Sequence, residues 1–276
     1  MRIDQTKCVA CGNCVAICPM EAIYIDPRTR RAAVNLDECV ECYSCHRGMS
    51  MERLNPVAVR TIRRALALFR LRFDPEPDVC PTSAITPDEL TWPRTVRRAF
   101  SDVTATHEST GIHGRGTEEV KTNDVTHRLG LGEVGLTVEL GRPGLGVRFH
   151  DVQRVTQGLA DAAVRFEQKN PVTSLMTDQA TGSLNPDILR EKVMSVIVEF
   201  SAPATDLPRV LQVLRRLAGE IETTMAVGVS VRCDRGGGTE VERMLADEHF
   251  DVVRAKTNLG LGRPDPVPAT ASSRGA

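Results

Sequence analysis

The chain has 276 residues, a formal net charge of −1 and 4% aromatic residues, with one Trp and two Tyr. A near-neutral charge gives no global field that would attract nucleic acid, and so few aromatic rings offer little platform for stacked bases. No apolar run reaches the roughly 18 residues that a membrane-spanning helix needs. The length allows two modest domains, or one domain with insertions.

The nine cysteines carry the strongest signal in the sequence. The first four form one closely spaced run that ends in proline, Cys8-x2-Cys11-x2-Cys14-x3-Cys18-Pro19. A second run begins in the same way, Cys39-x2-Cys42-x2-Cys45. Met49 stands where the fourth cysteine of this second run would be.

The missing cysteine has a candidate beyond an insertion at residues 46–79. The stretch Cys80-Pro81-Thr82-Ser83-Ala84-Ile85 repeats the pattern of Cys18-Pro19-Met20-Glu21-Ala22-Ile23. We therefore expect Cys80 to complete two sets of four cysteines. The spacing of two residues within each triplet favours metal ligation over disulfides, in a reducing cytoplasm with no signal peptide.

These motifs resemble the bacterial two-cluster ferredoxins over residues 1–46 and 78–90. Each [4Fe–4S] cluster takes four thiolates, and the cysteine before proline ligates the other cluster in this family. The resemblance implies that one cluster is held by Cys8, Cys11, Cys14 and Cys80. It implies that the other is held by Cys39, Cys42, Cys45 and Cys18.

The same resemblance implies a small pseudo-twofold fold, with a short helix after each Cys-Pro and paired short strands. Residues 22–25 and 32–35 are the candidate strand pair, and residues 26–29 have the composition of a turn. Two alternatives to this centre are a zinc site and a three-iron cluster. Zinc sites use separated pairs of cysteines, and a three-iron cluster usually follows loss of a ligand inside a triplet. Cys233, the ninth cysteine, is interpreted as a small buried hydrophobe at a strand end.

The insertion at 46–79 contains a predicted helix over residues 57–73. Asn55 and Pro56 are good residues for the N-cap and first helical positions. Apolar residues recur every three or four positions, and arginines fall on the other side, namely Arg60, Arg63, Arg64 and Arg70. Either this is an ordinary amphipathic helix with solvated arginines, or those arginines dock an acidic redox partner. A membrane-surface role is a weaker alternative.

Residues 93–132 are predicted to be a polar, Gly-rich connector. Within the 107–128 segment, His107, His113 and His127 are interpreted as solvated loop histidines. Another hypothesis is a bound anion, because glycines let backbone amides approach it. The basic residues among those glycines are Arg115, Lys121, Arg128 and Arg142. The G-x-G-x-x-G match at 130–135 precedes a strand-like run, so it does not fit a dinucleotide fingerprint.

Residues 133–263 alternate between strand and helix patterns, and residues 264–276 are predicted to be a flexible tail. The predicted strands cover 134–140, 146–149, 192–200, 225–231 and 250–255. Two helices are expected after Asp151 and Asp206, and a shorter one over 240–249. The expected fold class is α+β, with a dicluster ferredoxin domain at 1–92 and a C-terminal two-layer α/β sandwich. A ferredoxin-like, ACT-like arrangement is our specific expectation for that sandwich.

The leading functional hypothesis is an iron–sulfur electron-transfer protein or subunit with two [4Fe–4S] clusters, which passes single electrons to or from a larger redox enzyme. The alternatives are a reductase whose C-terminal domain binds a small substrate, and a redox-sensing regulator with an ACT-like ligand domain. We expect no residue to act as acid, base or nucleophile, no nucleic acid partner and no transmembrane segment. The C-terminal domain could also form homo- or hetero-oligomers.

Overall fold

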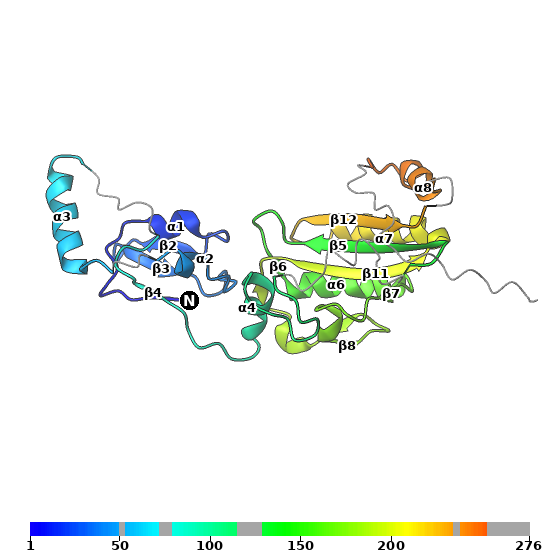
Figure 1. Cartoon of the computed structure of the whole chain (residues 1–276), viewed down its shortest axis with the longest axis horizontal. Helices are drawn as coiled ribbons and strands as arrows, with labels where there is room; N and C mark the ends of the chain where they lie inside the picture. The colour runs from blue at the N-terminus through cyan, green and yellow to red at the C-terminus, as the bar shows by residue number, and fades with distance from the viewer. Residues whose placement is uncertain (50–52, 72–78, 115–128, 234–237, 253–276) are drawn as a thin grey trace, which may run out of the picture.

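The computed structural model describes residues 1–49, 53–71, 79–114, 129–233 and 238–252. They form an N-terminal lobe and a larger C-terminal lobe, with helix α4 (Thr95–Ser101) between the two (Figure 1). No helix within these ranges is long and apolar enough to cross a membrane.

Two short antiparallel strand pairs build the N-terminal lobe. Strand β1 (Arg2–Ile3) pairs with β4 (Ile85–Thr86), and β2 (Ile23–Asp26) pairs with β3 (Arg31–Val34). The second pair and its turn confirm the sequence prediction, and the Asp26 carboxylate accepts a hydrogen bond from the Arg28 amide at 2.8 Å. The first pair brings the two ends of the lobe together, on either side of the insertion.

The short helices of this lobe are not where the resemblance placed them. Helix α1 (Asn13–Ile17) and helix α2 (Ser44–Arg47) each begin two residues after the second cysteine of a triplet. The expected helix after each Cys-Pro is wrong. Three residues after each Cys-Pro cysteine the backbone is left-handed: Glu21 follows Cys18, Ser83 follows Cys80, and both have φ of 51°. A left-handed residue at this point ends any helical turn and directs the chain into a strand.

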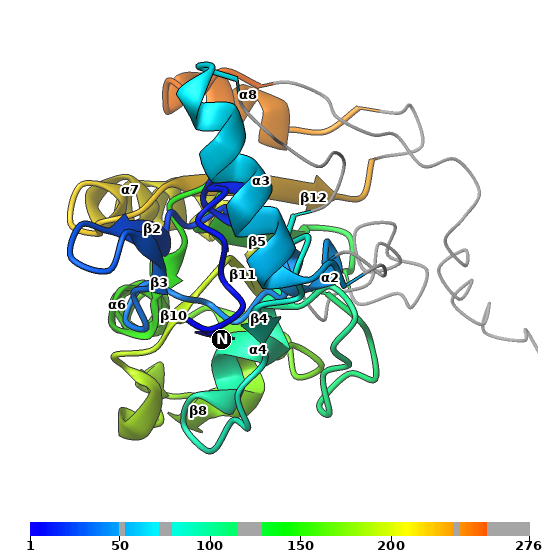
Figure 2. The same ribbon diagram turned by 90° about the vertical axis from the view of Figure 1, so that its left-hand side faces the viewer.

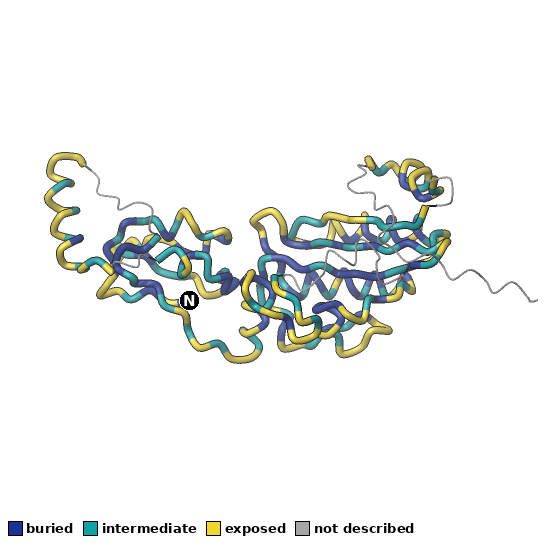
Figure 3. Tube along the Cα trace, in the orientation of Figure 1, coloured by how far each residue is buried: buried dark blue, intermediate teal, exposed yellow. Residues whose placement is uncertain are grey.

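The inserted helix α3 (Pro56–Leu68) stands at the outer end of the N-terminal lobe (Figures 1 and 2). Its start is confirmed, because the Asn55 side chain accepts hydrogen bonds from the amides of Val57 and Ala58. It ends earlier than predicted, and Arg70, with φ of 59°, lies just beyond it. The predicted apolar stripe is mostly exposed (Figure 3), and Val59 is the one buried residue of this helix.

A four-stranded antiparallel sheet forms the centre of the C-terminal lobe, in the order β12–β5–β11–β7. Its strands are β5 (Glu133–Leu140), β7 (Arg165–Phe166), β11 (Val196–Pro203) and β12 (Met225–Val231). Alternate residues of β5 are buried against helices α6 (Phe149–Asp161) and α7 (Leu207–Ala218). The two helices approach closely at Gly158, where a Cβ atom would lie 2.8 Å from Leu217. Sheet and helices therefore make two layers around one apolar core.

Smaller elements complete this lobe. Strand β6 (Val147–Arg148) pairs with β10 (Lys192–Val193), so the predicted strand over 192–200 is divided into β10 and β11. Between β7 and β10 lie the hairpin of β8 (Met176–Asp178) and β9 (Ser183–Leu184) and two short 3₁₀ turns. Helix α8 (Val241–Asp247) confirms the short helix near the end of the chain. The predicted last strand is not formed at residues 250–252, and its remainder lies outside the described residues, as does the expected tail.

Part of the expected connector at 93–132 is packed rather than extended. Helix α4 places Val96 and Phe100 in the core of the C-terminal lobe. His107 is also buried, at 5% exposure, with its ring edge-to-face against Phe100. The interpretation of His107 as a solvated histidine is therefore wrong, and burial lowers its pKa. The polar sequence hid this packing because only a few apolar residues carry it.

Candidate metal centre

All nine cysteines are free thiols. Cys233 is exposed and follows strand β12 by two residues, so its prediction as a buried residue is wrong. The other eight lie in the N-terminal lobe, where Cys18 is partly buried and the rest are buried. Four of the eight line one largely apolar cavity: Cys18, Cys39, Cys42 and Cys45.

Electrostatic coupling separates the eight thiols into two groups. Burial, and then the neighbouring Cys11, Cys8 and Cys80, raise the pKa of Cys14 to about 12. In the other group, burial and then Cys42, Cys39 and Cys18 raise the pKa of Cys45 to about 12. Cys45 also contributes to the raised pKa of Cys14, so the two groups are neighbours. With pKa values of about 12, the Cys14 and Cys45 thiols hold their protons in the absence of metal, and metal binding must release them.

The backbone of the two cysteine triplets follows the same path. The residue before the second cysteine is left-handed in both, with φ of 56° at Ala10 and 54° at Glu41. The residue after that cysteine is also left-handed in both, with φ of 87° at Gly12 and 61° at Tyr43. Such a repeated departure from ordinary backbone geometry indicates a duplicated thiol-presenting loop.

The structure brings Cys80 beside the position where the second run lacks its cysteine. Met49, which occupies that sequence position, forms an isolated parallel β-bridge with Cys80. The Val79 amide donates to the Gly48 carbonyl at 2.7 Å, so the two ends of the insertion meet there. The Ala84 amide donates to the Cys80 sulfur at 3.1 Å. Cys80 is thus close to Cys8, Cys11 and Cys14 although the insertion separates it from both cysteine runs.

The donor chemistry of both groups fits an iron–sulfur cluster. Each offers four thiols, and the cavity shared by one group is otherwise lined mainly by apolar side chains such as Met20 and Ile23. Within the described residues, no three or more cysteine, histidine or acidic side chains converge on a position for a single metal ion. In the second group the four thiols line a cavity instead, and a multi-atom cluster requires such a space.

Two arginines of α3 lie against the first cysteine loop, an arrangement that neither sequence alternative, solvated arginines or a docking surface, had foreseen. The Arg60 Nη2 atom donates to the carbonyls of Thr6 and Cys8, the latter at 3.1 Å. Arg63 donates to the Ala10 carbonyl at 3.4 Å. Arg64 and Arg70 are exposed. The helix periodicity separated arginines from the apolar stripe correctly, but it could not reveal that part of the arginine side faces the cluster region.

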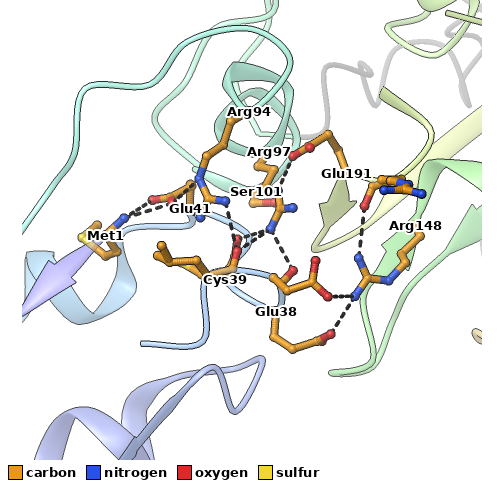
Figure 4. Close-up of polar contacts among 12 residues, drawn as sticks. Met1, Glu38, Cys39, Glu41, Arg94, Arg97, Ser101, Arg148 and Glu191 are labelled. Carbon is orange, nitrogen blue, oxygen red and sulfur yellow. Dashed lines mark hydrogen bonds and ion pairs between the residues drawn. The ribbon is translucent and has the colours of Figure 1, made fainter. Parts of the chain in front are cut away.

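Sequence analysis missed a dense polar contact between the lobes at residues 36–41, the segment that presents Cys39 (Figure 4). The cations come from α4 and from the β6–β10 pair, and they are Arg94, Arg97, Arg148 and Lys192. Arg148 binds Asp37 at 2.9 Å and Glu38 at 2.7 Å. The signal that could have revealed this contact was the spacing of Val96 and Phe100, which fits a packed helix carrying Arg97.

Glu41 is the most buried acid of this contact, with no exposed surface. Its carboxylate accepts from the terminal ammonium of Met1 at 2.9 Å and from Arg94 at 2.7 Å. The pKa of the neighbouring Cys39 thiol is raised, first by burial and then by the charge of Glu41, whereas Arg94 lowers it. The charges around this loop therefore act on a thiol of the second group.

The remaining sequence candidates do not form a second centre in the described residues. Arg142 forms an ion pair with Glu139 at 3.4 Å. His113 accepts or donates a hydrogen bond at the Thr106 hydroxyl, 2.9 Å away. The other members of the histidine and anion hypotheses lie outside the described residues: Arg115, Lys121, His127 and Arg128. The G-x-G-x-x-G stretch leads into β5, as the pattern indicated.

Comparison with known proteins agrees with this geometry. A family model described as a 4Fe-4S dicluster domain matches residues 1–47. Two curated relatives, both named Ferredoxin-1 and both from Rhodobacter capsulatus, are 39% identical over 46 residues, covering 17% of this chain and 68% of each relative. No solved structure matches the chain. The chain therefore belongs to the ferredoxins with a 4Fe-4S dicluster domain, iron–sulfur proteins of electron transfer, and its cofactors are two [4Fe–4S] clusters.

Proposed function

We propose that the protein relays single electrons between a donor and a larger redox enzyme through two neighbouring clusters. One cluster is held by Cys8, Cys11, Cys14 and Cys80, and the other by Cys39, Cys42, Cys45 and Cys18. The observation that carries this proposal is the placement of the eight thiols: Cys18, Cys39, Cys42 and Cys45 line one cavity, and Cys80 returns to the gap in the second run beside Met49. Because all nine cysteines are free, we assign the protein to a reducing cytoplasm.

The chain's own contribution is to orient thiols and to exclude water. Buried apolar residues surround both groups, and Met1, Ala22, Ile23, Val40 and Ile85 are each at most 3% exposed. Backbone amides near the sulfurs, such as that of Ala84, stabilise negative charge on them. When bound, the clusters supply the one-electron chemistry, at potentials that hydrogen bonds and burial adjust.

For the C-terminal lobe, we infer a ferredoxin-like βαββαβ fold that serves docking or assembly. The strand–helix–strand unit β5–α6–β7 is followed by a second, β11–α7–β12, and all neighbouring strands are antiparallel. A cavity of about 470 Å³ lies at the sheet. It is lined by residues of β5, β7, β11 and β12, and by Leu129 before β5. None of its described lining residues is a cysteine. All of the lining residues that the structure describes belong to the C-terminal lobe, which favours the regulator alternative over the reductase alternative, since a reductase needs its substrate beside a cluster.

The redox partner docks on the outer side of α3. This helix exposes Arg64 and the apolar Ile62 and Leu68, and the residues that follow it, Phe69 and Arg70, are exposed as well. An arginine-rich surface with an apolar centre suits a partner with an acidic, partly apolar patch. The same helix rests on the first cysteine loop through Val59, which packs near Val9 and Cys11. A partner on α3 therefore comes close to the first cluster.

Charge reversal on α3 tests this docking surface. In the double variant Arg64→Glu and Arg70→Glu, electron transfer to the partner should slow at low salt and become less salt-dependent, because electrostatic steering is lost. The matched control is Arg243→Glu, which changes an arginine that is 71% exposed on α8, remote from the cysteines. Equal rates and equal salt slopes in the double variant and the control would exclude α3 as the docking surface.

A further inference from the structure

Arg97, on helix α4 outside the ferredoxin unit, binds the backbone of the second cysteine loop. Its side chain is 4% exposed, and its Nη1 atom lies 3.0, 2.8 and 2.9 Å from the carbonyl oxygens of Leu36, Asp37 and Cys39. The Nε atom of Arg97 donates to the carboxylate of Glu191, a residue of the C-terminal lobe (Figure 4). A buried cation therefore connects the backbone of a cluster ligand to the other lobe.

Arg60 makes the equivalent contact at the first cysteine loop. It donates to the carbonyls of Thr6 and Cys8, as Arg97 does to those of Asp37 and Cys39. Cys8 and Cys39 are the first cysteines of their triplets, and Thr6 and Asp37 each lie two residues before them. The backbone is matched here as well, since the amides of Cys8 and Cys39 donate to the carbonyls four residues earlier, at 2.9 and 3.0 Å. Two unrelated helices, α3 and α4, thus supply a guanidinium to the same pair of carbonyls.

We propose that Arg60 and Arg97 are matched positioning residues, each of which orients the first ligand of one cluster and raises the reduction potential of that cluster. Reduction adds negative charge to a cluster, and a nearby fixed cation favours the more negative state. Each arginine belongs to a different added element, so α3 and the C-terminal lobe adjust the two potentials separately. This inference rests on the proposed function, because it assigns Cys8 and Cys39 to different clusters.

The two arginines differ in how strongly they should act. Arg97 is almost fully buried, where charges are poorly screened, whereas Arg60 is only partly buried. The Glu191 carboxylate offsets part of the Arg97 charge. Neutralising Glu191 should therefore have the opposite effect from neutralising Arg97. This opposition of sign separates an electrostatic role from simple damage to the fold.

The test compares potentials in the holoprotein, after iron analysis has established that both clusters are present. Arg97→Gln should lower one potential by an amount equal to about tenfold in the one-electron equilibrium constant, or about 59 mV, with a much smaller change in the other. Arg60→Gln should lower the other potential, by less. Glu191→Gln should raise the potential that Arg97→Gln lowers. Arg154→Gln, at a half-exposed arginine of α6 that binds Asp151, is the matched control and should change neither.

Amide hydrogen exchange supplies a second readout and identifies the affected loop. Arg97→Gln should accelerate exchange in residues 36–41, and Arg60→Gln should accelerate it in residues 4–8. Arg97→Lys keeps the charge, but its single nitrogen cannot bind the Glu191 carboxylate and the loop carbonyls at the same time as the Nε and Nη1 atoms of Arg97 do. It should therefore restore much of the potential without fully restoring slow exchange. If Arg97→Gln does not retain its clusters, Glu191→Gln and Arg97→Lys carry the test.

Two results would overturn the inference in a protein that holds both clusters. One is that each glutamine variant shifts the two potentials equally or not at all. The other is that Glu191→Gln fails to raise a potential. A wild-type protein that does not hold two clusters would instead contradict the proposed function, and iron analysis detects that outcome before any variant is compared.

Discussion

The two halves of the ferredoxin unit share a backbone but differ in what holds them. Around the first triplet, an exposed helix contributes Val59, Arg60 and Arg63 at the surface of the lobe. Around the second triplet, residues 36–41 are fixed by four cations from α4 and the C-terminal lobe and by the buried carboxylate of Glu41. The duplicated motif therefore specifies the thiol positions, while different added elements hold the two loops: α3 contacts the first, and α4 with the C-terminal lobe contacts the second.

The largest expected effect concerns Cys80, which we propose as the fourth ligand of the first cluster. Cys80→Ser should remove the cluster held with Cys8, Cys11 and Cys14 and leave the other, because each cluster takes four thiolates. Iron and sulfide analysis should fall from about eight to about four atoms of each per chain. The EPR spectrum of the reduced protein should also lose the broadening that comes from two interacting clusters.

Cys233→Ser is the matched control, since Cys233 is exposed and follows β12 in the other lobe. It should retain the full iron content. Full iron and an unchanged EPR spectrum in Cys80→Ser would remove Cys80 from the ligand set and leave the duplication of the two halves incomplete.

An intermediate effect concerns Glu41, which has no charged counterpart at the equivalent Ala10 of the first half. Glu41→Gln removes the buried carboxylate that the Met1 ammonium and the Arg94 guanidinium share, and leaves the buried ammonium with Asp88, at 3.2 Å. Removing one partner of a buried pair costs about 3–5 kcal/mol. The midpoint of anaerobic urea unfolding, followed by circular dichroism, should fall accordingly.

Glu38→Gln is the matched control within the same loop, because Glu38 is one-third exposed and binds Arg148 and Lys192. A partly exposed pair is worth about 1 kcal/mol or less. Equal shifts in the two variants would show that burial does not distinguish the second half in the way described.

The smallest expected effect is pH-dependent and concerns Asp102, which ties Arg47 of the second half to the end of α4. Burial raises the pKa of Asp102, but hydrogen bonds from Thr104, Arg47 and Arg98 outweigh it and lower the pKa below 3.8. The folded protein then binds fewer protons than the unfolded chain in this range. The stability from Asp102 is therefore complete above about pH 3.8 and is lost as pH falls through the lower folded value.

Urea unfolding of wild type and Asp102→Asn at a series of pH values measures this contribution. The difference in unfolding free energy should be largest near neutral pH and should shrink toward acid. Asp206→Asn, at a half-exposed surface pair with Arg209, serves as the control and should show little difference at any pH. A difference for Asp102→Asn that grows toward acid would contradict the sign of the pKa shift.

Sequence reasoning was most reliable where local chemistry decides the structure. Asn55 and Pro56 start a helix whatever the rest of the chain does, and alternating Val and Leu residues in β5 require a half-buried strand. Helix ends were less predictable. The end of α3 depends on residues near Phe69 that have little to pack against, and Phe69 is 75% exposed. Periodicity marks an apolar face, but it does not say whether anything covers that face.

The partners of Arg97 were harder to predict than its helix, for a different reason. Arg97 binds carbonyl oxygens, which every residue possesses, so its partners at Leu36, Asp37 and Cys39 leave no mark in the amino-acid pattern. The Cys-Pro echo at Cys80, in contrast, was visible because thiol ligation demands one residue type. Side chains that act on backbone groups are therefore the part of a site that a single sequence conceals.

The meeting of Met49 and Cys80 has a consequence for how such a protein can change. The insertion begins after Gly48 and ends at Val79, and a hydrogen bond joins the backbones of these two residues. They lie so close that a Cβ atom on Gly48 would be 2.2 Å from the Val79 side chain. The position of the Cys80 thiol therefore does not depend on the number of residues between Gly48 and Val79. Because lengthening a closed loop adds little entropic cost, a segment of another length could close the same loop. A different segment between these two points would keep Cys80 in place but would lose the contacts of Val59 and Arg60 with the first cysteine loop.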